Sequence, residues 1–166
     1  MIAVDTSILA YAVNRYVREH ARAAAVIETL AHGDIPWALP WPVVDEFVRT
    51  VTRAHVAPRP LAPSDALGFI AALLDSPAVL ALGPAHRHAA VLAELLESHA
   101  RGEPPPSGFE VAAVLREHGV RELLSADPGM RRFGFLTVID PVHGPEWSPE
   151  MAPARRYRRL RGQQAE

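Results

Sequence analysis

Short runs of apolar residues alternate along the chain with longer segments in which apolar positions recur every three or four residues. The short runs are typical of buried strands, and the longer segments are typical of helices that bury one face. Alternating strands and helices predict an α/β fold with a central, mostly parallel sheet and helices on both faces. The expected strands span residues 2–4, 36–39, 78–82, 121–124 and 136–139, and the expected helices span residues 8–13, 17–31, 42–51, 64–74, 85–99 and 109–117.

With 166 residues, 49% of them hydrophobic and 22% charged, the chain has the composition of one globular domain. We expect Trp37, Trp41 and Phe47 in its core. The net charge of −2 gives no bulk attraction for nucleic acid, and the lack of cysteine excludes disulfides, thiolate zinc sites and a cysteine nucleophile. Asp5 interrupts the first apolar run, and no run approaches the roughly 18 residues of a membrane span. We therefore expect a cytoplasmic protein without a signal peptide or membrane segment.

Asp5 ends the first predicted strand, in the run IAVDTS at residues 2–7. Open α/β sheets bind their ligands at the carboxyl ends of their strands, so Asp5 is placed for chemistry. A carboxylate directly after a buried strand is costly unless a positive charge lies against it, and a metal ion would supply that charge. Thr6 and Ser7 can cap the helix that begins at Ile8. The alternative is that Asp5 is itself a cap that only satisfies backbone N–H groups.

Two further carboxylates occupy comparable positions. Glu46 lies in the first turns of the helix opened by Pro42, among apolar neighbours, whereas Asp45 is offset by about 100° and faces water. Asp127 follows the predicted strand at 121–124. Each acid alone is explained equally well as a cap or a surface ion pair. Like charges gathered at one edge repel unless a cation or proton intervenes, and an oxygen-only cluster suits Mg²⁺ or Mn²⁺ rather than zinc.

Five short segments carry a family resemblance by their order and spacing. They are VDTS at 4–7, VDEFVR at 44–49 with VT at 51–52, RPLAP at 59–63 with Ala66, VAA at 111–113 with EHG at 117–119, and LSAD at 124–127 with RF at 132–133. Together they resemble the PIN-domain ribonucleases, specifically the VapC-type toxins of VapBC toxin–antitoxin pairs. The resemblance covers about residues 1–142 and implies a PIN-like three-layer sandwich. Residues 143–166 are then a C-terminal extension rich in Arg.

The resemblance implies an Mg²⁺- or Mn²⁺-dependent endoribonuclease that blocks translation by cutting RNA and is silenced by a small VapB-type antitoxin. Asp5 and Asp127 would be metal ligands, and Glu46 would bind the metal or orient one of its waters. Thr6 or Ser7 would position Asp5 or touch phosphate. The cation would lower the pKa of a bound water and neutralise charge in the transition state. The resemblance also implies a homodimer.

The chain departs from the family at the start of the predicted helix over 109–117, where the family carries an Asp. Counting from the two flanks places Ser107 or Gly108 there, and neither is an acid. Glu110 is the nearest carboxylate, but it is rotated from Gly108 by about 200° around the helix, which makes it a weak substitute. Residues 128–130 are a second departure, because the family often has a further Asp there. The loss of one acid predicts weaker metal binding.

The C-terminal extension carries five Arg residues within seven positions. Such a run can bind the phosphates of RNA, and Tyr157 could stack on a base. The alternative, a solvated and disordered tail, is the more common outcome for a charge run of this kind. The five residues are Arg155, Arg156, Arg158, Arg159 and Arg161.

Three functions therefore remain open. The first is an active metal-dependent endoribonuclease toxin. The second is a catalytically impaired PIN module that binds RNA or an antitoxin. The third is a different small α/β enzyme whose acids only resemble the PIN set. The order of the matched segments favours the first, and the missing acid keeps the second in contention.

Overall fold

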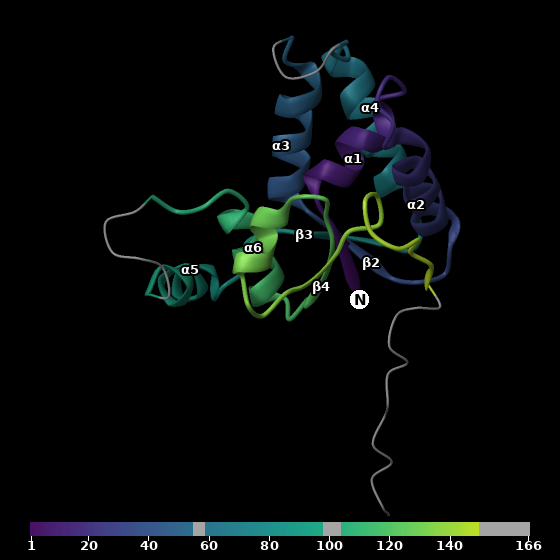
Figure 1. Ribbon diagram of the computed structural model, residues 1–166. Coiled ribbons are helices and arrows are strands. Elements are labelled where there is room, and N and C mark those ends of the chain that lie inside the picture. The colour runs from purple at the N-terminus through teal and green to yellow at the C-terminus, as the bar shows by residue number, and fades with distance from the viewer. Residues whose placement is uncertain (55–58, 98–103, 150–166) are drawn as a thin grey trace, which may run out of the picture.

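The computed structural model describes residues 1–54, 59–97 and 104–149, and its elements follow the predicted order (Figure 1). The strands are β1 (Ile2–Val4), β2 (Trp37–Pro40), β3 (Val79–Leu82), β4 (Glu122–Leu124) and β5 (Thr137–Ile139). The helices are α1 (Thr6–Val13), α2 (His20–His32), α3 (Trp41–Thr52), α4 (Pro63–Leu74), α5 (His88–Glu97) and α6 (Phe109–Glu117), and a 3₁₀ helix, η1, spans Pro128–Arg132.

The five strands form one parallel sheet with the order β3-β2-β1-β4-β5. The chain moves from β1 outward to β3, then crosses back to place β4 on the other side of β1. The space between the carboxyl ends of β1 and β4 is therefore the point where the winding direction reverses, which is where open α/β sheets bind ligands. The backbone N–H of Asp5 donates to the carbonyl of Leu124 at 3.0 Å, so the pairing of β1 with β4 extends to the first acid.

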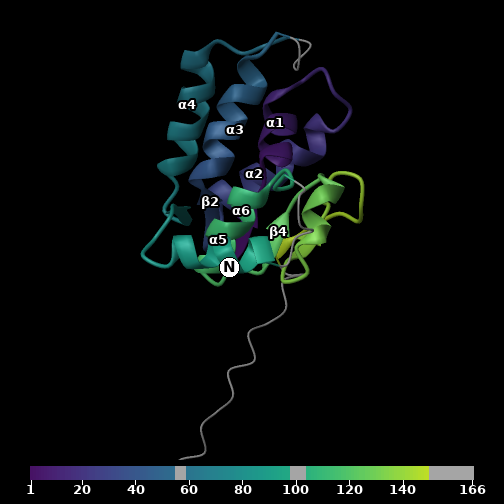
Figure 2. The ribbon, with the colours of Figure 1, turned by 90° about the vertical axis from the view of Figure 1, so that its left-hand side faces the viewer.

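Helices cover both faces of the sheet, as predicted. Crossover connections between parallel strands are right-handed, so opposite directions of travel place the connecting helices on opposite faces. The connections β1–β2 and β2–β3 lead towards one edge of the sheet, whereas the connection β3–β4 leads back in the opposite direction. The helices α5 and α6 of this last connection therefore lie on the opposite face from the helices of the first two connections. Figure 1 shows α5 and α6 on one side of the strands and α2 on the other. Figure 2 shows α3 and α4 side by side, extending beyond the carboxyl ends of the strands.

The core lies on both faces of β1 and β2. All three residues of β1 and all four of β2 are buried, as expected for central parallel strands. Trp37 and Phe47 are fully buried, which confirms their predicted core positions. Trp41 does not follow the prediction, since 49% of it is exposed. It is the first residue of α3, at the edge of the sheet, where the start of the helix does not pack on the core.

Five of the six helix starts differ from the prediction by one to three residues, and α2 begins at His20 rather than Val17. Helix α1 begins at Thr6 rather than Ile8, and Asp5 is its N-cap. Helix α4 begins at Pro63, one residue before the predicted start, and Ala62 is its N-cap. Helix α5 begins at His88 rather than Ala85, and the three residues before it form a turn whose N–H groups bind a carboxylate from α6.

The chain beyond β5 packs onto α2. The Arg22 guanidinium on α2 donates to the carbonyls of Val142 and Gly144 at 2.7 and 2.8 Å. Trp147 is buried at 8% exposure and belongs to the hydrophobic core. The described part of the C-terminal extension thus adds to the domain, while the Arg-rich run at 155–161 lies outside the described residues. In the described residues, no helix has the length and apolar content needed to cross a membrane.

Candidate active site

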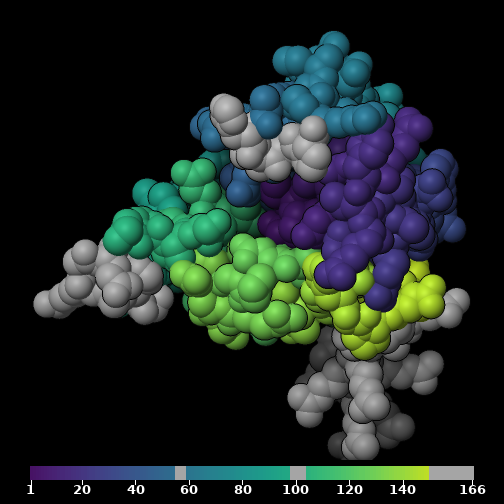
Figure 3. All heavy atoms as spheres, turned by 45° about the horizontal axis from the view of Figure 1, so that its top comes forward, coloured from purple at the N-terminus to yellow at the C-terminus, as the bar shows by residue number. Residues whose placement is uncertain are grey.

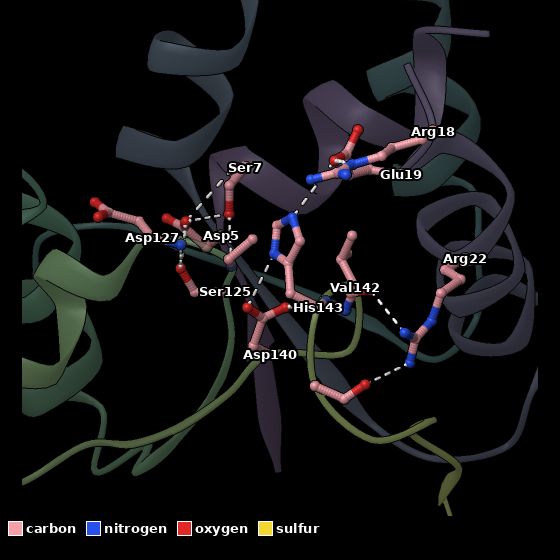
Figure 4. Close-up of polar contacts among 12 residues, drawn as sticks. Asp5, Ser7, Arg18, Glu19, Arg22, Ser125, Asp127, Asp140, Val142 and His143 are labelled. Carbon is pink, nitrogen blue, oxygen red and sulfur yellow. Dashed lines mark hydrogen bonds and ion pairs between the residues drawn. The ribbon is translucent and has the colours of Figure 1, made fainter. Parts of the chain in front are cut away.

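Asp5 lies at the reversal point of the sheet and is almost fully buried, with 5% of the residue exposed. Its Oδ2 accepts hydrogen bonds from the hydroxyls of Ser125 at 2.7 Å and Ser7 at 2.8 Å, and from the backbone N–H of Ser7 at 3.4 Å (Figure 4). The last of these bonds makes Asp5 the N-cap of α1, where the helix dipole also favours a negative charge. All of these bonds reach Oδ2, so Oδ1 is the atom that remains for a ligand. Capping and chemistry are therefore compatible at this residue.

Two serines join the ends of β1 and β4 around the Asp5 carboxylate. The Ser7 hydroxyl donates to Asp5 and accepts from the N–H of Ala126 at 3.0 Å. The Ser125 hydroxyl, 1% exposed, donates to Asp5 and accepts from the N–H of Asp127 at 3.0 Å. Sequence reasoning singled out Ser7 but missed Ser125. The available signal was a polar residue directly after the buried Leu123–Leu124 pair, where an unbonded hydroxyl would be costly.

Asp127 lies beside Asp5 at the start of η1 (Figure 4). Its Oδ1 accepts a hydrogen bond from the N–H of Gly129 at 2.7 Å, which makes it the N-cap of η1. A Cβ at Gly129 would lie 2.9 Å from Oδ1 of Asp127, so a larger residue there would force this carboxylate to shift. The absence of a side chain at Gly129 therefore leaves room for the Asp127 carboxylate to bond to the backbone N–H of Gly129. Figure 3 shows this edge of the sheet, with the start of the chain in dark purple framed by the blue α3 region and the green C-terminal elements.

Glu46 joins the same edge through Thr6. The Thr6 hydroxyl, on a residue 7% exposed, donates to Oε2 of Glu46 at 2.8 Å. Glu46 itself is exposed. Asp45 points away and pairs with Arg49 at 2.9 Å, as the helical offset predicts. Sequence reasoning expected Thr6 to position Asp5 or touch phosphate, but the hydrogen bond of its side chain goes to the second acid instead.

The donor set at this edge consists of oxygens, as Mg²⁺ or Mn²⁺ requires. Among the described residues, no Arg or His forms an ion pair with any of the three acids, and Asp5 is held by neutral donors alone. The described residues contain no group of three or more His, Asp or Glu side chains placed to hold a metal together. Asp5 and Asp127 lie beside each other (Figure 4), and Glu46 accepts a hydrogen bond from Thr6, the residue that follows Asp5. Two carboxylates with retained waters are a common way to hold Mg²⁺.

At Gly108, which with Ser107 is one of the two positions expected for the missing family acid, another side chain fills the space. Gly108 is the N-cap of α6, with φ of +76°, and a Cβ on it would collide with Sδ of Met130. Met130 is buried, so it cannot easily give way. Glu110 is exposed and shares a groove of about 760 Å³ with Glu46, whose described lining includes neither Asp5 nor Asp127. The chain thus has no direct replacement for the acid at this point of the described structure.

A second polar cluster lies just beyond β5, also at the carboxyl edge (Figure 4). Asp140 accepts from the N–H groups of Val142 and His143 at 2.9 Å and from the His143 ring at 3.1 Å, and the same ring lies 3.5 Å from Glu19. Burial acts to raise the pKa of Asp140, but these donors outweigh it and hold the pKa below its usual value. The cluster fastens the C-terminal segment to the start of α2, and sequence reasoning gave no sign of it.

Comparison with known proteins identifies relatives over nearly the whole chain. The chain is 35% identical over 144 residues to ribonuclease VapC43 of Mycobacterium tuberculosis, covering 87% of this chain and 97% of that protein. The crystal structure of VapC20 of M. tuberculosis, described as a sarcin–ricin loop cleaving toxin, matches with a TM-score of 0.58 and 22% identity over 82% of this chain and 97% of that one. VapBC2 from Rickettsia felis, solved with a promoter DNA fragment, matches with a TM-score of 0.58 and 15% identity over 84% of this chain and 98% of that one. No protein-family model matches the chain.

These likenesses agree with the geometry of the site. The solved structures share the fold, and the relative at 35% identity matches over 144 residues, which is 87% of this chain. An unrelated α/β enzyme whose acids only imitate this arrangement is excluded by identity of that extent. The chain belongs to the VapC family of PIN-domain toxins, whose members are named as ribonucleases.

Proposed function

We propose that this protein is the toxin of a toxin–antitoxin pair and that it hydrolyses RNA at the edge formed by Asp5 and Asp127, with Mg²⁺ or Mn²⁺ as cofactor. One observation carries the proposal most directly. Asp5 is a nearly buried carboxylate at the reversal point of the sheet, and its hydrogen bonds with the described residues all come from neutral donors and all reach one oxygen. A buried negative charge without a cationic partner is costly, and a divalent cation would offset that cost.

The residues of the chain divide the work between them. Asp5 offers Oδ1 and Asp127 offers Oδ2, since the other oxygen of each is bonded within the protein. Ser7 and Ser125 hold the Asp5 carboxylate in one orientation, and Thr6 holds Glu46 where it can orient a water. When bound, the cation lowers the pKa of a water molecule and neutralises charge on the phosphate. No side chain need form a covalent bond to RNA.

Two measurements test the proposal on the full chain. Asp127→Asn keeps an oxygen for the N–H of Gly129, so we expect it to fold while losing most affinity for Mn²⁺ in isothermal titration. Cleavage of a labelled single-stranded RNA should require Mg²⁺ or Mn²⁺, stop in EDTA, and fall roughly 100-fold or more in Asp127→Asn. Equal cleavage in EDTA, or unchanged Mn²⁺ binding by the variant, would show that the acids do not form the site.

A second candidate function is a catalytically impaired module that binds RNA or its antitoxin. The observation that favours it is Met130 filling the place of a side chain on Gly108. Asp tolerates a positive φ better than most residues, so Gly108→Asp combined with Met130→Ala provides both the acid and the space. An impaired wild type predicts that this double variant binds Mn²⁺ more tightly and cuts RNA faster. Full turnover by the wild type would rule the impaired function out.

We also propose a VapB-type antitoxin as partner and a homodimer as the assembled toxin. The antitoxin is supported by VapBC2, which has the same fold and whose structure is of VapBC2 with a promoter DNA fragment, and the homodimer rests on the family resemblance. Co-expression with the product of a small neighbouring gene, followed by affinity purification and light scattering, tests both points. A toxin that arrests growth equally with and without that gene product would contradict the first, and a monomeric mass would contradict the second.

A further inference from the structure

A groove of about 790 Å³ begins at the active-site edge and leads away from it. Ser7, which bonds Asp5, lines its inner end. From there the groove runs along the last turns of α1 and the turn after it, and its far wall is the end of α3 with residues 59–61. The purple and blue segments that form this region lie on the face shown in Figure 3. The groove is therefore continuous with the site and long enough to hold more than the reacting phosphate.

The two charged residues in the described lining of this groove are opposite in sign to the net charge of the chain. Arg15 and Arg59 line it together with the neutral polar residues Asn14 and Thr50, and none of its described lining residues is Asp or Glu. The chain as a whole carries a net charge of −2. Neither Arg15 nor Arg59 is paired with a carboxylate within the described residues. A cationic channel that ends at the acidic edge fits a polyanion that must be drawn towards that edge.

Tyr16 stands at the outer end of the groove with its ring held in place. The Arg59 guanidinium lies 4.3 Å from the ring centroid and donates to the Tyr16 hydroxyl at 2.6 Å. The backbone N–H of Tyr16 is bonded to the side chain of Asn14 at 3.1 Å, which fixes the turn. Even so, 61% of Tyr16 is exposed. An aromatic ring backed by a guanidinium and open to solvent is the arrangement on which proteins stack unpaired bases.

We propose that this groove binds single-stranded RNA, with Tyr16 stacking on a base and Arg15 and Arg59 contacting the phosphates. This inference rests on the proposed function, because it supplies the substrate path for the same site. The floor of the groove is apolar around Val13, Val17 and Leu61, which suits the face of a base as well as a peptide side chain. The charged residues of the described lining are both Arg, and together with the exposed Tyr16 ring they favour the nucleic acid.

The binding test separates stacking from charge. A labelled RNA of eight uridines is titrated against the full chain in EDTA, so that no cleavage occurs, and polyphosphate serves as a competitor without bases. Tyr16→Ala should weaken RNA binding roughly 5- to 100-fold and leave competition by polyphosphate unchanged. Tyr16→Phe, which keeps the ring, should retain most of the affinity. Arg59→Ala should weaken both ligands and reduce the slope of log affinity against log salt by about 0.7.

Two control variants match these changes outside the groove. Trp41→Ala removes an aromatic residue that is 49% exposed at the start of α3, and Arg18→Ala removes a cation whose side chain is 87% exposed. Neither should change RNA affinity by more than twofold. Equal losses in Tyr16→Ala and Trp41→Ala would overturn the proposal. So would a Tyr16→Ala variant that binds RNA normally but no longer co-purifies with its antitoxin, since the groove would then be a protein-binding surface.

The outcome stays distinct from that of the proposed function. Tyr16-dependent RNA binding by a protein that cuts no RNA in Mg²⁺ would support this inference and contradict the nuclease. Cation-dependent cleavage that is indifferent to Tyr16 and Arg59 would support the nuclease and contradict this inference.

Discussion

Two carboxylates of this protein are shielded from solvent in different ways, and the contrast separates a reactive acid from a structural one. Asp5 is 5% exposed and accepts three hydrogen bonds, all on Oδ2. The side chain of Glu117, at the end of α6, is 4% exposed and uses both oxygens. Its Oε1 accepts from the N–H of Arg87 at 2.8 Å, and its Oε2 accepts from the N–H of Ala85 and the His88 ring at 3.0 Å.

The difference lies in what each acid leaves unused. The Glu117 carboxylate accepts hydrogen bonds from the backbone N–H groups of the turn before α5, although it belongs to α6. The His88 ring beside it can carry a positive charge when protonated. Asp5 keeps one oxygen for a ligand and has no cationic neighbour among the described residues. Burial of a carboxylate alone is therefore a poor sign of function. Incomplete use of its oxygens at the reversal point of the sheet is a better one.

Changing Asp5 to Asn should have the largest effect on activity and little effect on folding. The amide can turn its oxygen to the two serines and its NH₂ to the open position, so the bonds that cap α1 survive. We expect RNA cleavage to fall by at least roughly 10³-fold while the unfolding temperature changes little. Cleavage assays and thermal melts on the same preparation check both. A variant that unfolds early would mean that Asp5 is structural, as Glu117 is.

The matching change of Glu117 to Gln should do the reverse. Both of its oxygens face donors, so an NH₂ group in either orientation meets an N–H group instead of an acceptor. We expect the unfolding temperature to drop by several degrees, with the activity of the folded protein unchanged. Glu94→Gln is the control, because the ion pairs of Glu94 with described residues are long, exposed contacts of 3.8 and 3.6 Å to Arg87 and Arg116. Equal melting of the two variants would remove Glu117 from its proposed structural role.

Ser125→Ala should affect both properties, because the hydroxyl serves the site and the fold together. Its loss leaves the N–H of Asp127 without its acceptor and removes one of the two hydroxyls that orient Asp5. We expect a loss of about 1–3 kcal/mol in the free energy of unfolding and a decrease in cleavage of roughly 10- to 100-fold. Urea titration and RNA cleavage measure the two effects. Activity retained in full would show that Ser7 orients Asp5 alone.

The smallest expected effect is a dependence of stability on pH that comes from Glu117. Burial acts to raise the pKa of Glu117, but the N–H groups and His88 outweigh it and hold the pKa below its usual value of 4.5. The folded state therefore favours the carboxylate. Its stabilisation is complete above the unfolded pKa of about 4.5 and is lost as the pH falls through the lower folded pKa. The difference in unfolding free energy between wild type and Glu117→Gln should shrink from pH 6 to pH 3, and a constant difference would refute the linkage.

Much of the architecture could be predicted because it depends on local pattern. The run at residues 2–4 and the pair Leu123–Leu124 are apolar in a way that only central parallel strands require. Asp5 follows the first strand directly and Asp127 follows the second after two residues, so their meeting at one edge could be predicted once the sheet was assumed parallel. Trp41 could not be placed in the same way. Its apolar character predicts burial, yet its position at the first turn of α3 decides its exposure.

The sequence by itself determined which elements form, their order, and which carboxylates end a strand, because each depends on residues close together in the chain. Only the tertiary structure decided how each carboxylate is bonded, because the partners come from far away: Ser125 is 120 positions from Asp5, and Ala85 is 32 positions from Glu117. Met130 fills the space beside Gly108 for the same reason, because the two residues are distant in the chain and meet only in the fold. Hydrogen bonds and steric contacts act over a few ångströms in space, whatever the distance along the chain.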